Sequence, residues 1–226
     1  MDIRVIASGS SGNCYRVSDG KTSLLLDAGI PFRKIQEGLC FRIGEIDGAL
    51  ISHKHGDHAK AVPELLRRGV EVYGPPDFCE MYAGAKKTNP LRPFVLNTFT
   101  ITAFDAIHDV ECNGYILDTT QERLVYITDT AYIKYTFPGM THLMVEANYS
   151  EKILLENVAA GTVPEAMAKR VIQSHMSIEQ TEELCRAASS QNLRQIFLLH
   201  LSNSNSNAME FSDRIKKATG AEVYIA

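Results

Sequence analysis

Three histidines and one aspartate fall within six consecutive residues of this chain, in the segment His53-Lys54-His55-Gly56-Asp57-His58. The segment follows the apolar run Gly48–Ile51, which is typical of a buried strand. In an extended backbone, side chains two residues apart point the same way, so His53 and His55 can face one point. Such a density of imidazoles is hard to explain by packing, and it predicts metal ligands at the end of a strand.

The second half of the segment predicts a change of direction. Gly56 allows a tight turn, and Asp57 and His58 then lie at the start of a helix and can face a second point. Imidazole combined with carboxylate suits zinc, manganese or iron. The alternative reading is a solvated polar loop, which we regard as the weaker one.

Four ligands in one loop cannot complete two metal sites, so further ligands are expected at other strand ends. His108 follows the run Phe99–Ile107, and Asp129 and His200 each follow an apolar run. For any one of them alone, a hydrogen-bonded side chain at a strand end is the better explanation. Their recurrence favours function, because α/β folds collect functional groups at the carboxyl ends of strands.

Two histidines depart from this pattern. His175 precedes a helix, and we interpret it as an acid or phosphate-binding group facing the substrate, with a simple capping role as the alternative. His142 precedes an apolar run, and an exposed or capping role is expected for it. The Gly/Ser loop Ser8–Asn13 could place backbone N–H groups near an anion, but a plain β-turn is at least as good an explanation.

Apolar runs of strand length and helical patterns alternate along the chain, without a linker or repeat. Helices are predicted at 59–68, 178–188 and 208–218, and Ser177 and Gln180 have the spacing of a capping box. We therefore expect a single α/β domain over residues 1–226. The predicted strands are Ile3–Ala7, Ser23–Leu26, Ala49–Ser52, Val70–Tyr73, Phe99–Ala103, Tyr115–Leu117, Leu124–Thr128, Leu143–Glu146, Gln195–Leu199 and Glu222–Ile225.

Composition narrows the setting. The five cysteines are scattered and form no CxxC pair, which argues against a disulfide framework and a cysteine zinc site. Reduced thiols and the absence of a signal-like or membrane-spanning apolar stretch predict a cytoplasmic protein without membrane contact. The formal net charge of −4 weighs slightly against extensive phosphate contact, although bound cations would offset it locally.

Taken together, these residues resemble the metallo-β-lactamase fold superfamily, whose HxHxDH motif matches His53–His58 in residue type and spacing. The resemblance extends over essentially the whole chain. It is similar in particular to the WalJ/YycJ-like group, which is related to the phosphodiesterase PhnP and to ribonuclease Z. The segments that carry this closer resemblance are Ser8–Tyr15, Leu26–Gly29, Glu146–Tyr149, His175–Ser177 and His200–Ser202.

The resemblance implies an α/β fold, an αβ/βα four-layer sandwich, with two divalent metal ions at one edge. It implies zinc or manganese, with iron as a third candidate. The metals would be held in two groups with one bridging residue. The implied ligands are His53, His55 and His108 for one metal, Asp57, His58 and His200 for the other, and Asp129 between them.

The leading functional prediction is metal-dependent phosphodiester hydrolysis of an exonuclease-like kind, with DNA favoured as substrate. Metals of this type lower the pKa of a bound water to about 7. Asp57 would orient the nucleophile, and His175 would stabilise phosphoryl charge or protonate the leaving oxygen. The chain departs from its relatives in two ways: it has no room for the large inserted cap of the β-CASP enzymes, and it shows no long, Gly-rich basic arm like that of ribonuclease Z, so tRNA processing is not expected. The alternatives are a small-molecule hydrolase, such as a cyclic phosphodiesterase or lactonase, and a non-catalytic metal-binding regulator.

Overall fold

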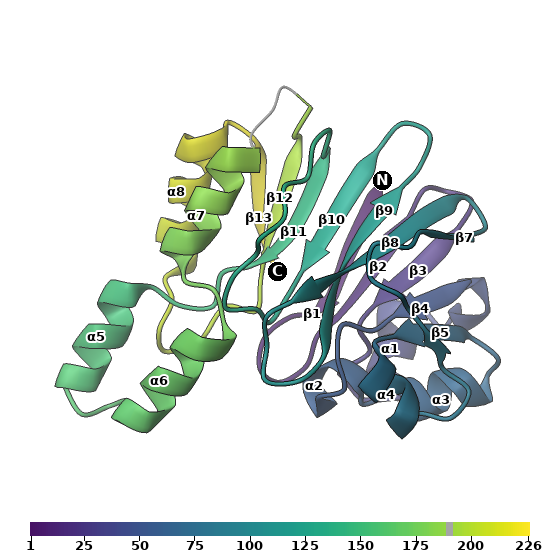
Figure 1. The fold of residues 1–226 in the computed structure, drawn as a ribbon, viewed down its shortest axis with the longest axis horizontal. Helices are drawn as coiled ribbons and strands as arrows, with labels where there is room; N and C mark the ends of the chain where they lie inside the picture. Colours follow the sequence, from purple (N-terminus) through teal and green to yellow (C-terminus); the bar gives the residue numbers. More distant parts are fainter. Residues whose placement is uncertain (189–191) are drawn as a thin grey trace. The chain divides into compact units, whose positions relative to one another are not determined.

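The computed structural model describes residues 1–188 and 192–226, and the chain divides into two compact units (Figure 1). Unit 1 comprises Met1–Asp105 and Val110–Glu122, and unit 2 comprises Ala106–Asp109 and Arg123–Ala226. Each unit combines a sheet with helices, in line with the predicted α/β class. The expectation of a single domain over 1–226 stays a prediction.

Unit 1 is built on a sheet with the strand order β1-β2-β3-β4-β5-β6. The first three strands are antiparallel, and β3 to β6 run parallel. The strands are β1 (Asp2–Ala7), β2 (Cys14–Ser18), β3 (Ser23–Leu26), β4 (Gly48–Leu50), β5 (Glu71–Gly74) and β6 (Lys86–Lys87). The helices are α1 (Phe32–Gly38), η1 (Ile43–Glu45), α2 (Gly56–Ala59), α3 (Val62–Arg67) and α4 (Pro76–Met81). Later strands of the unit are β7 (Phe94–Leu96), most of β8 (Phe99–Ala106) and β9 (Cys112–Asp118).

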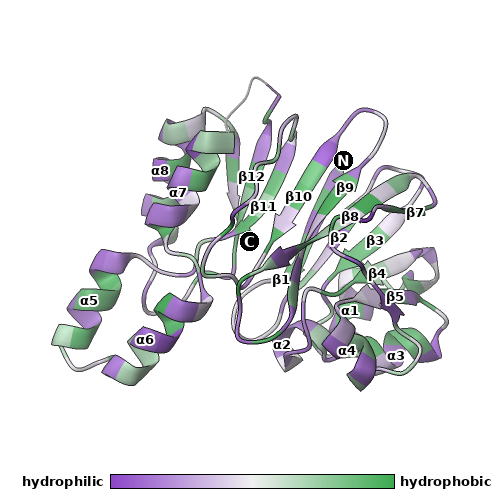
Figure 2. Ribbon diagram, viewed as in Figure 1, coloured by the Kyte–Doolittle hydropathy of each residue, from purple (hydrophilic) through white to green (hydrophobic). Residues whose placement is uncertain are grey.

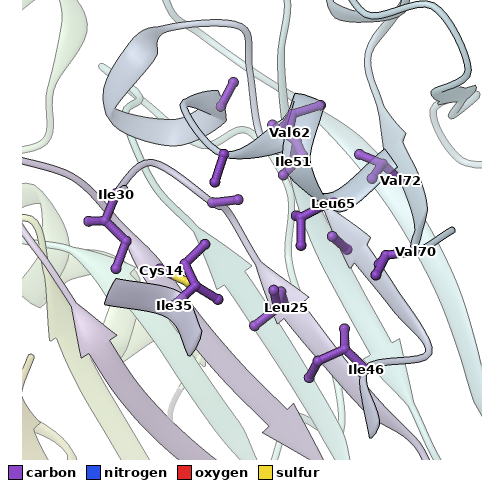
Figure 3. Close-up of a cluster of buried hydrophobic side chains, with 14 of the residues drawn as sticks. Cys14, Leu25, Ile30, Ile35, Ile46, Ile51, Val62, Leu65, Val70 and Val72 are labelled. Carbon is purple, nitrogen blue, oxygen red and sulfur yellow. The ribbon is translucent and has the colours of Figure 1, made fainter. Parts of the chain in front are cut away.

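The core of unit 1 lies between its sheet and its helices (Figure 3). Leu25 and Ile51 come from the strand side, and Ile35, Val62 and Leu65 come from the helices, all of them fully buried. Burying an aliphatic side chain of this size contributes roughly 1.5–3 kcal/mol each. This packing fixes the end of β4, from which the histidine-rich segment emerges.

One predicted helix of unit 1 is divided in two. The pattern at 59–68 predicts a single helix, whereas α2 ends at Ala59 and α3 begins at Val62. Pro63 lies in the first turn of α3, where its missing N–H costs nothing. Inside a continuous helix the same proline would remove a hydrogen bond, so the helix restarts before it.

Unit 2 holds a parallel sheet with the order β13-β12-β11-β10. In Figure 2 the labelled strands β10, β11 and β12 carry hydrophilic as well as hydrophobic residues along their length, and the helices are likewise hydrophobic on part of their surface and hydrophilic on the rest. The strands are β10 (Arg123–Ile127), β11 (His142–Glu146), β12 (Gln195–Leu199) and β13 (Glu222–Ile225). The helices are α5 (Glu151–Ala159), α6 (Glu165–Ser174), α7 (Ile178–Ala188) and α8 (Ala208–Thr219).

The start of α7 confirms the predicted capping box. The Ser177 N–H donates to Gln180 Oε1 at 2.9 Å, and the Gln180 N–H donates to Ser177 Oγ at 3.2 Å. These reciprocal bonds satisfy two backbone groups that a helix start leaves open. They also fix the segment immediately before the helix, which contains His175. Among the described residues, no helix is both long and apolar enough to cross a membrane.

Candidate metal centre

In unit 1 the predicted residues lie between the end of β4 and the end of α2, and they form two donor pairs. His53 Nε2 lies 3.0 Å from His55 Nδ1, so two imidazole nitrogens face the same point. His58 Nε2 lies 3.7 Å from Asp57 Oδ2. The sequence pattern predicted this division into two directions. Gly56 is not required for the turn, because it has no positive φ and a Cβ there would meet open space.

A buried carboxylate fixes the orientation of the unit 1 imidazoles. Asp27 follows β3, and its Oδ2 accepts from His58 Nδ1 at 2.7 Å. Ser52 joins the same network through its Oγ, 2.9 Å from both Asp27 oxygens and 3.0 Å from His53 Nδ1. With Nδ1 of His58 donating to Asp27, the Nε2 atom keeps its lone pair for a ligand. Metal-binding histidines are commonly oriented by such a carboxylate.

The loop Ser8–Asn13 packs against this network as a turn. Gly9 N–H donates to Asn13 Oδ1 at 3.0 Å, and Asn13 Nδ2 lies 3.2 Å from His58 Nε2. The Asn13 N–H donates to the carbonyl of Asp57 at 2.8 Å. These contacts favour the β-turn interpretation over an anion-binding loop.

Gly29 allows a close backbone approach at the same place. A Cβ built on Gly29 would lie 1.6 Å from the carbonyl oxygen of Asp57, a distance that no side chain can occupy. Its neighbour Ala28 donates its N–H to the His58 carbonyl at 2.8 Å. The segment after β3 therefore holds the histidine-rich segment through both backbone and side chain.

In unit 2 four predicted residues also come together: His108, Asp129, His175 and His200. The rings of His175 and His200 stack with centroids 5.3 Å apart, and those of His108 and His175 lie 5.9 Å apart. His200 Nε2 lies 3.9 Å from Asp129 Oδ1. Candidate ligand atoms of Asp129, Glu146, His175 and His200 all lie within 4.8 Å of one another.

Glu146, the last residue of β11, is the buried carboxylate of unit 2. Its Oε1 lies 2.5 Å from His175 Nδ1 and 3.3 Å from His200 Nδ1. Its Oε2 accepts from the N–H groups of Thr130 and Met176, each at 3.2 Å. Burial alone would lower the pKa of His175, but the charge of Glu146 and the hydrogen bond to it raise that pKa overall.

His108 has a different environment. Its Nδ1 donates to the carbonyl of Ser174 at 3.1 Å, which leaves Nε2 as the ligand atom, 3.1 Å from Asp109 Oδ1. Burial lowers the pKa of His108, and this outweighs the opposing charges of Asp129 and Asp109. The imidazole is therefore neutral at neutral pH, which is the form that binds metal.

Three of these residues share an unusual backbone. Asp27, Asp129 and His200 follow the strands β3, β10 and β12, and their φ values are +56°, +36° and +53°. Residues other than glycine rarely adopt positive φ, and this backbone conformation costs of order 1 kcal/mol or more. Strain of this kind, repeated at strand ends, is typical of functional sites.

Side chains of these networks that were outside the predicted site set include Asn13, Asp27, Ser52 and Glu146. The two carboxylates could have been selected by the rule that drew attention to Asp129, because each closes an apolar strand. His142 is buried rather than exposed, with Nδ1 2.8 Å from Thr141 Oγ1. It opens β11, at the end of the strand opposite Glu146.

The donor chemistry of each unit fits divalent cations. Both sets combine imidazole nitrogens with carboxylate oxygens, the ligands preferred by zinc, manganese and iron. In both, a buried carboxylate contacts Nδ1 of a histidine, and in unit 1 the other nitrogen of that histidine, His58 Nε2, lies 3.7 Å from Asp57 Oδ2. The five cysteines, all in the described part of the chain, are free thiols.

Comparison with known proteins gives the class. Residues 22–201 match the family model described as "Beta-lactamase superfamily domain", and the chain belongs to that superfamily. This membership confirms the predicted metallo-β-lactamase fold and the expected class of metal-dependent hydrolases.

Named relatives confirm the closer resemblance. The chain is 28% identical over 223 residues to "Exodeoxyribonuclease WalJ" of Streptococcus pneumoniae, covering 89% of this chain and 81% of that protein. It is 26% identical over 234 residues to "Exodeoxyribonuclease YycJ" of Bacillus anthracis, covering 91% and 84%. The metallo-beta-lactamase fold protein YhfI of Bacillus subtilis has the same fold, with a TM-score of 0.78, 21% identity and coverage of 99% and 95%.

Proposed function

We propose that this protein is a phosphodiesterase of the exonuclease kind that uses two divalent metal ions and acts on DNA. The observation that carries the proposal is the paired arrangement of buried carboxylate and imidazole in each unit, Asp27 with His58 and Glu146 with His175. An orienting carboxylate behind a histidine is what a metal ligand or a proton-transferring histidine needs. In unit 1 the second nitrogen of His58 lies 3.7 Å from Asp57 Oδ2, and in unit 2 the ring of His175 stacks on that of His200.

The proposed ligand assignment follows the superfamily motif. His53, His55 and His108 hold one ion, and Asp57, His58 and His200 hold the other, with Asp129 as the bridging carboxylate. The donor pairs within unit 1 support the division between the first two groups. When bound, two such cations supply an acidified water and neutralise charge on a phosphate. The identity of the metal, zinc or manganese before iron, is part of the test.

The chain's own residues have separate roles in this proposal. Asp57 orients the attacking water. His175 faces the phosphate and supplies a positive charge or a proton to the leaving oxygen, since Glu146 favours its protonated form. His175 is therefore distinct from the metal ligands, although it lies beside His200.

DNA is favoured as substrate by the relatives, which are named exodeoxyribonucleases. The net charge of −4 places the recognition of phosphate on the metals and on local groups rather than on a basic surface. The cytoplasmic setting expected from the free thiols fits a nucleic-acid substrate and stays a prediction.

The test uses purified full-length protein loaded with zinc or manganese. DNA strands labelled at the 5′ or the 3′ end are followed over time, together with bis-p-nitrophenyl phosphate, a cyclic nucleotide and a lactone. Stepwise shortening from one end, abolished by EDTA and in Asp129→Ala purified in parallel, is the expected result. Turnover of the cyclic nucleotide or lactone alone would favour a small-molecule hydrolase. Tight metal binding without turnover of any ester would favour the non-catalytic regulator.

A further inference from the structure

An aromatic groove lies beside the candidate ligands of unit 2. It has a volume of about 290 Å³ and runs between the segment after β10 and helix α7. A second hollow of about 320 Å³ shares Tyr135 and Leu184 with it and continues toward Phe137. A volume of this size is near the lower end of ligand pockets, so it suits one ring system rather than a folded partner. Its lining includes Tyr132, Tyr135, Met176 and Gln180, with one basic side chain, Lys134, and one acidic side chain, Glu183.

Two residues of the groove lining are close in the sequence to candidate site residues of unit 2. Met176, which lines one end, follows His175 directly, and its N–H donates to Glu146 Oε2 at 3.2 Å. The same carboxylate contacts His175 at 2.5 Å. At the other wall, Tyr132 lies three residues after Asp129. Residues of the groove lining are therefore next to His175 and near Asp129 in the sequence, which is the reason for asking whether a group beside a His175-bound phosphate enters the groove.

The side chain of Gln180 joins the two walls of the groove by hydrogen bonds. Gln180 Nε2 donates to the carbonyl of Ala131 at 3.2 Å, and Gln180 Oε1 accepts from the Ser177 N–H at 2.9 Å. These bonds join the segment before Tyr132 to the start of α7. A site formed by fixed walls loses less entropy on binding than one that must be ordered.

The lining matches the chemistry of a nucleotide. Tyr132 is 59% exposed, so its ring is accessible to a ligand. The Lys134 ammonium lies over the Tyr135 ring, 5.2 Å from its centre, so a positive charge is held against one face of this ring. Bases stack on tyrosine rings, and the attached phosphate is drawn to a nearby ammonium.

We propose that this groove binds a nucleobase of the DNA strand, the one attached to the phosphate that reaches His175. Tyr132 and Tyr135 provide the stacking surfaces, and Lys134 attracts the adjoining phosphate. The inference rests on the proposed function and narrows its substrate to a nucleotide carrying a base. Recognition by stacking predicts little discrimination among the four bases, because every base has an aromatic face.

Binding is tested on metal-free, full-length protein, which cannot cleave the probe. A short single-stranded DNA with 2-aminopurine at one or the other terminal nucleotide reports stacking by loss of its fluorescence, and anisotropy of a separate dye reports binding. Wild type and Tyr132→Phe are expected to quench the probe. Tyr132→Ala and Tyr135→Ala are expected to weaken binding about tenfold or more and to lose the quench. Tyr224→Ala, which removes a 41% exposed tyrosine on β13, is the matched control.

Kinetics separate the groove from the proposed activity. With metal present, thymidine 5′-p-nitrophenyl phosphate carries a base and bis-p-nitrophenyl phosphate carries none. The two alanine variants should lower kcat/KM about tenfold more for the first substrate than for the second. Equal effects on both substrates, or quenching equal to wild type in both variants, would overturn the proposal that the groove binds a nucleobase. If the wild-type enzyme cleaves neither substrate, the proposed phosphodiesterase activity is wrong. The metal-free binding experiment then still shows whether the groove binds a nucleobase.

Discussion

Asp27 Oδ2 lies 2.7 Å from His58 Nδ1, and both side chains are fully buried. The same relationship recurs in unit 2, where Glu146 Oε1 lies 2.5 Å from His175 Nδ1. In each case the carboxylate closes an apolar strand and contacts an imidazole that comes from another segment. The orientation of His58, a proposed ligand, and of His175, the proposed acid, is thus set by carboxylates that are not ligands in the proposed assignment.

Replacing Asp27 by asparagine tests this role. Asp27→Asn keeps the shape but removes the charge that fixes His58, so metal affinity should fall about 10–100-fold. The measurement is a competition titration against a chelator of known affinity, with folding checked by circular dichroism. Asp47→Asn is the control, because that carboxylate accepts from the Ser23 N–H at 2.8 Å, outside the networks described above. Unchanged affinity in Asp27→Asn would refute the orienting role.

His175 and Asp129 should separate chemistry from metal binding. His175→Ala is expected to retain metal near the wild-type level and to lower kcat for phosphodiester cleavage about 10²-fold or more. Asp129→Ala should lose metal and activity together, because a bridging carboxylate holds both ions. Metal analysis beside single-turnover rates measures both effects. If His175→Ala loses metal as Asp129→Ala does, His175 is a ligand and the division of roles is wrong.

Gly29 should tolerate no side chain. Gly29→Ala places a methyl group within 1.6 Å of the Asp57 carbonyl, so the backbone must move. Overpacking of this kind costs about 1–3 kcal/mol or more, and it displaces the segment that carries the ligands. Gly44→Ala is the control, since a Cβ there meets nothing within 4 Å. Chemical denaturation compares the two, and similar free energies of unfolding would contradict the close approach.

The pair of Glu146 and His175 should make the metal-free protein sensitive to pH. The pKa of His175 is raised in the folded state, so the folded protein binds its proton more tightly than the unfolded chain does. The stabilisation is complete below the ordinary histidine pKa of about 6.5 and is lost as pH rises through the higher folded value. Thermal unfolding of chelator-treated protein between about pH 5 and 9 should show this decline. His175→Gln should reduce the decline, and an identical pH profile would exclude the pair as its source.

The histidine-rich segment and the strand ends were predictable because short-range rules decide them. Ser23–Leu26, Gln195–Leu199 and Glu222–Ile225 are strands with the predicted bounds, and the capping box at Ser177 formed as expected. Apolar runs and local hydrogen bonds depend on residues that are close in the sequence. The way in which strands and helices assemble into each unit depends on contacts between distant segments.

Other features were not predicted. Strand β2 and helices α5 and α6 are among them, although α6 has apolar residues at helical spacing, with Met167, Val171 and Ile172 on one side. Asp27 and Glu146 follow or close apolar strands, which the sequence shows, but their partners could not be predicted. Asp27 contacts His58 across 31 residues and Glu146 contacts His175 across 29, and no local spacing encodes such contacts.

The positive φ values of Asp27, Asp129 and His200 have a consequence for the evolution of this protein. Glycine would adopt the same backbone without strain, so a change to glycine at these positions trades catalytic capacity for conformational ease. Selection for heat resistance alone would accept such exchanges, whereas selection for turnover would reject them. A library screened only for melting temperature is therefore expected to drift toward robust proteins that no longer process their substrate.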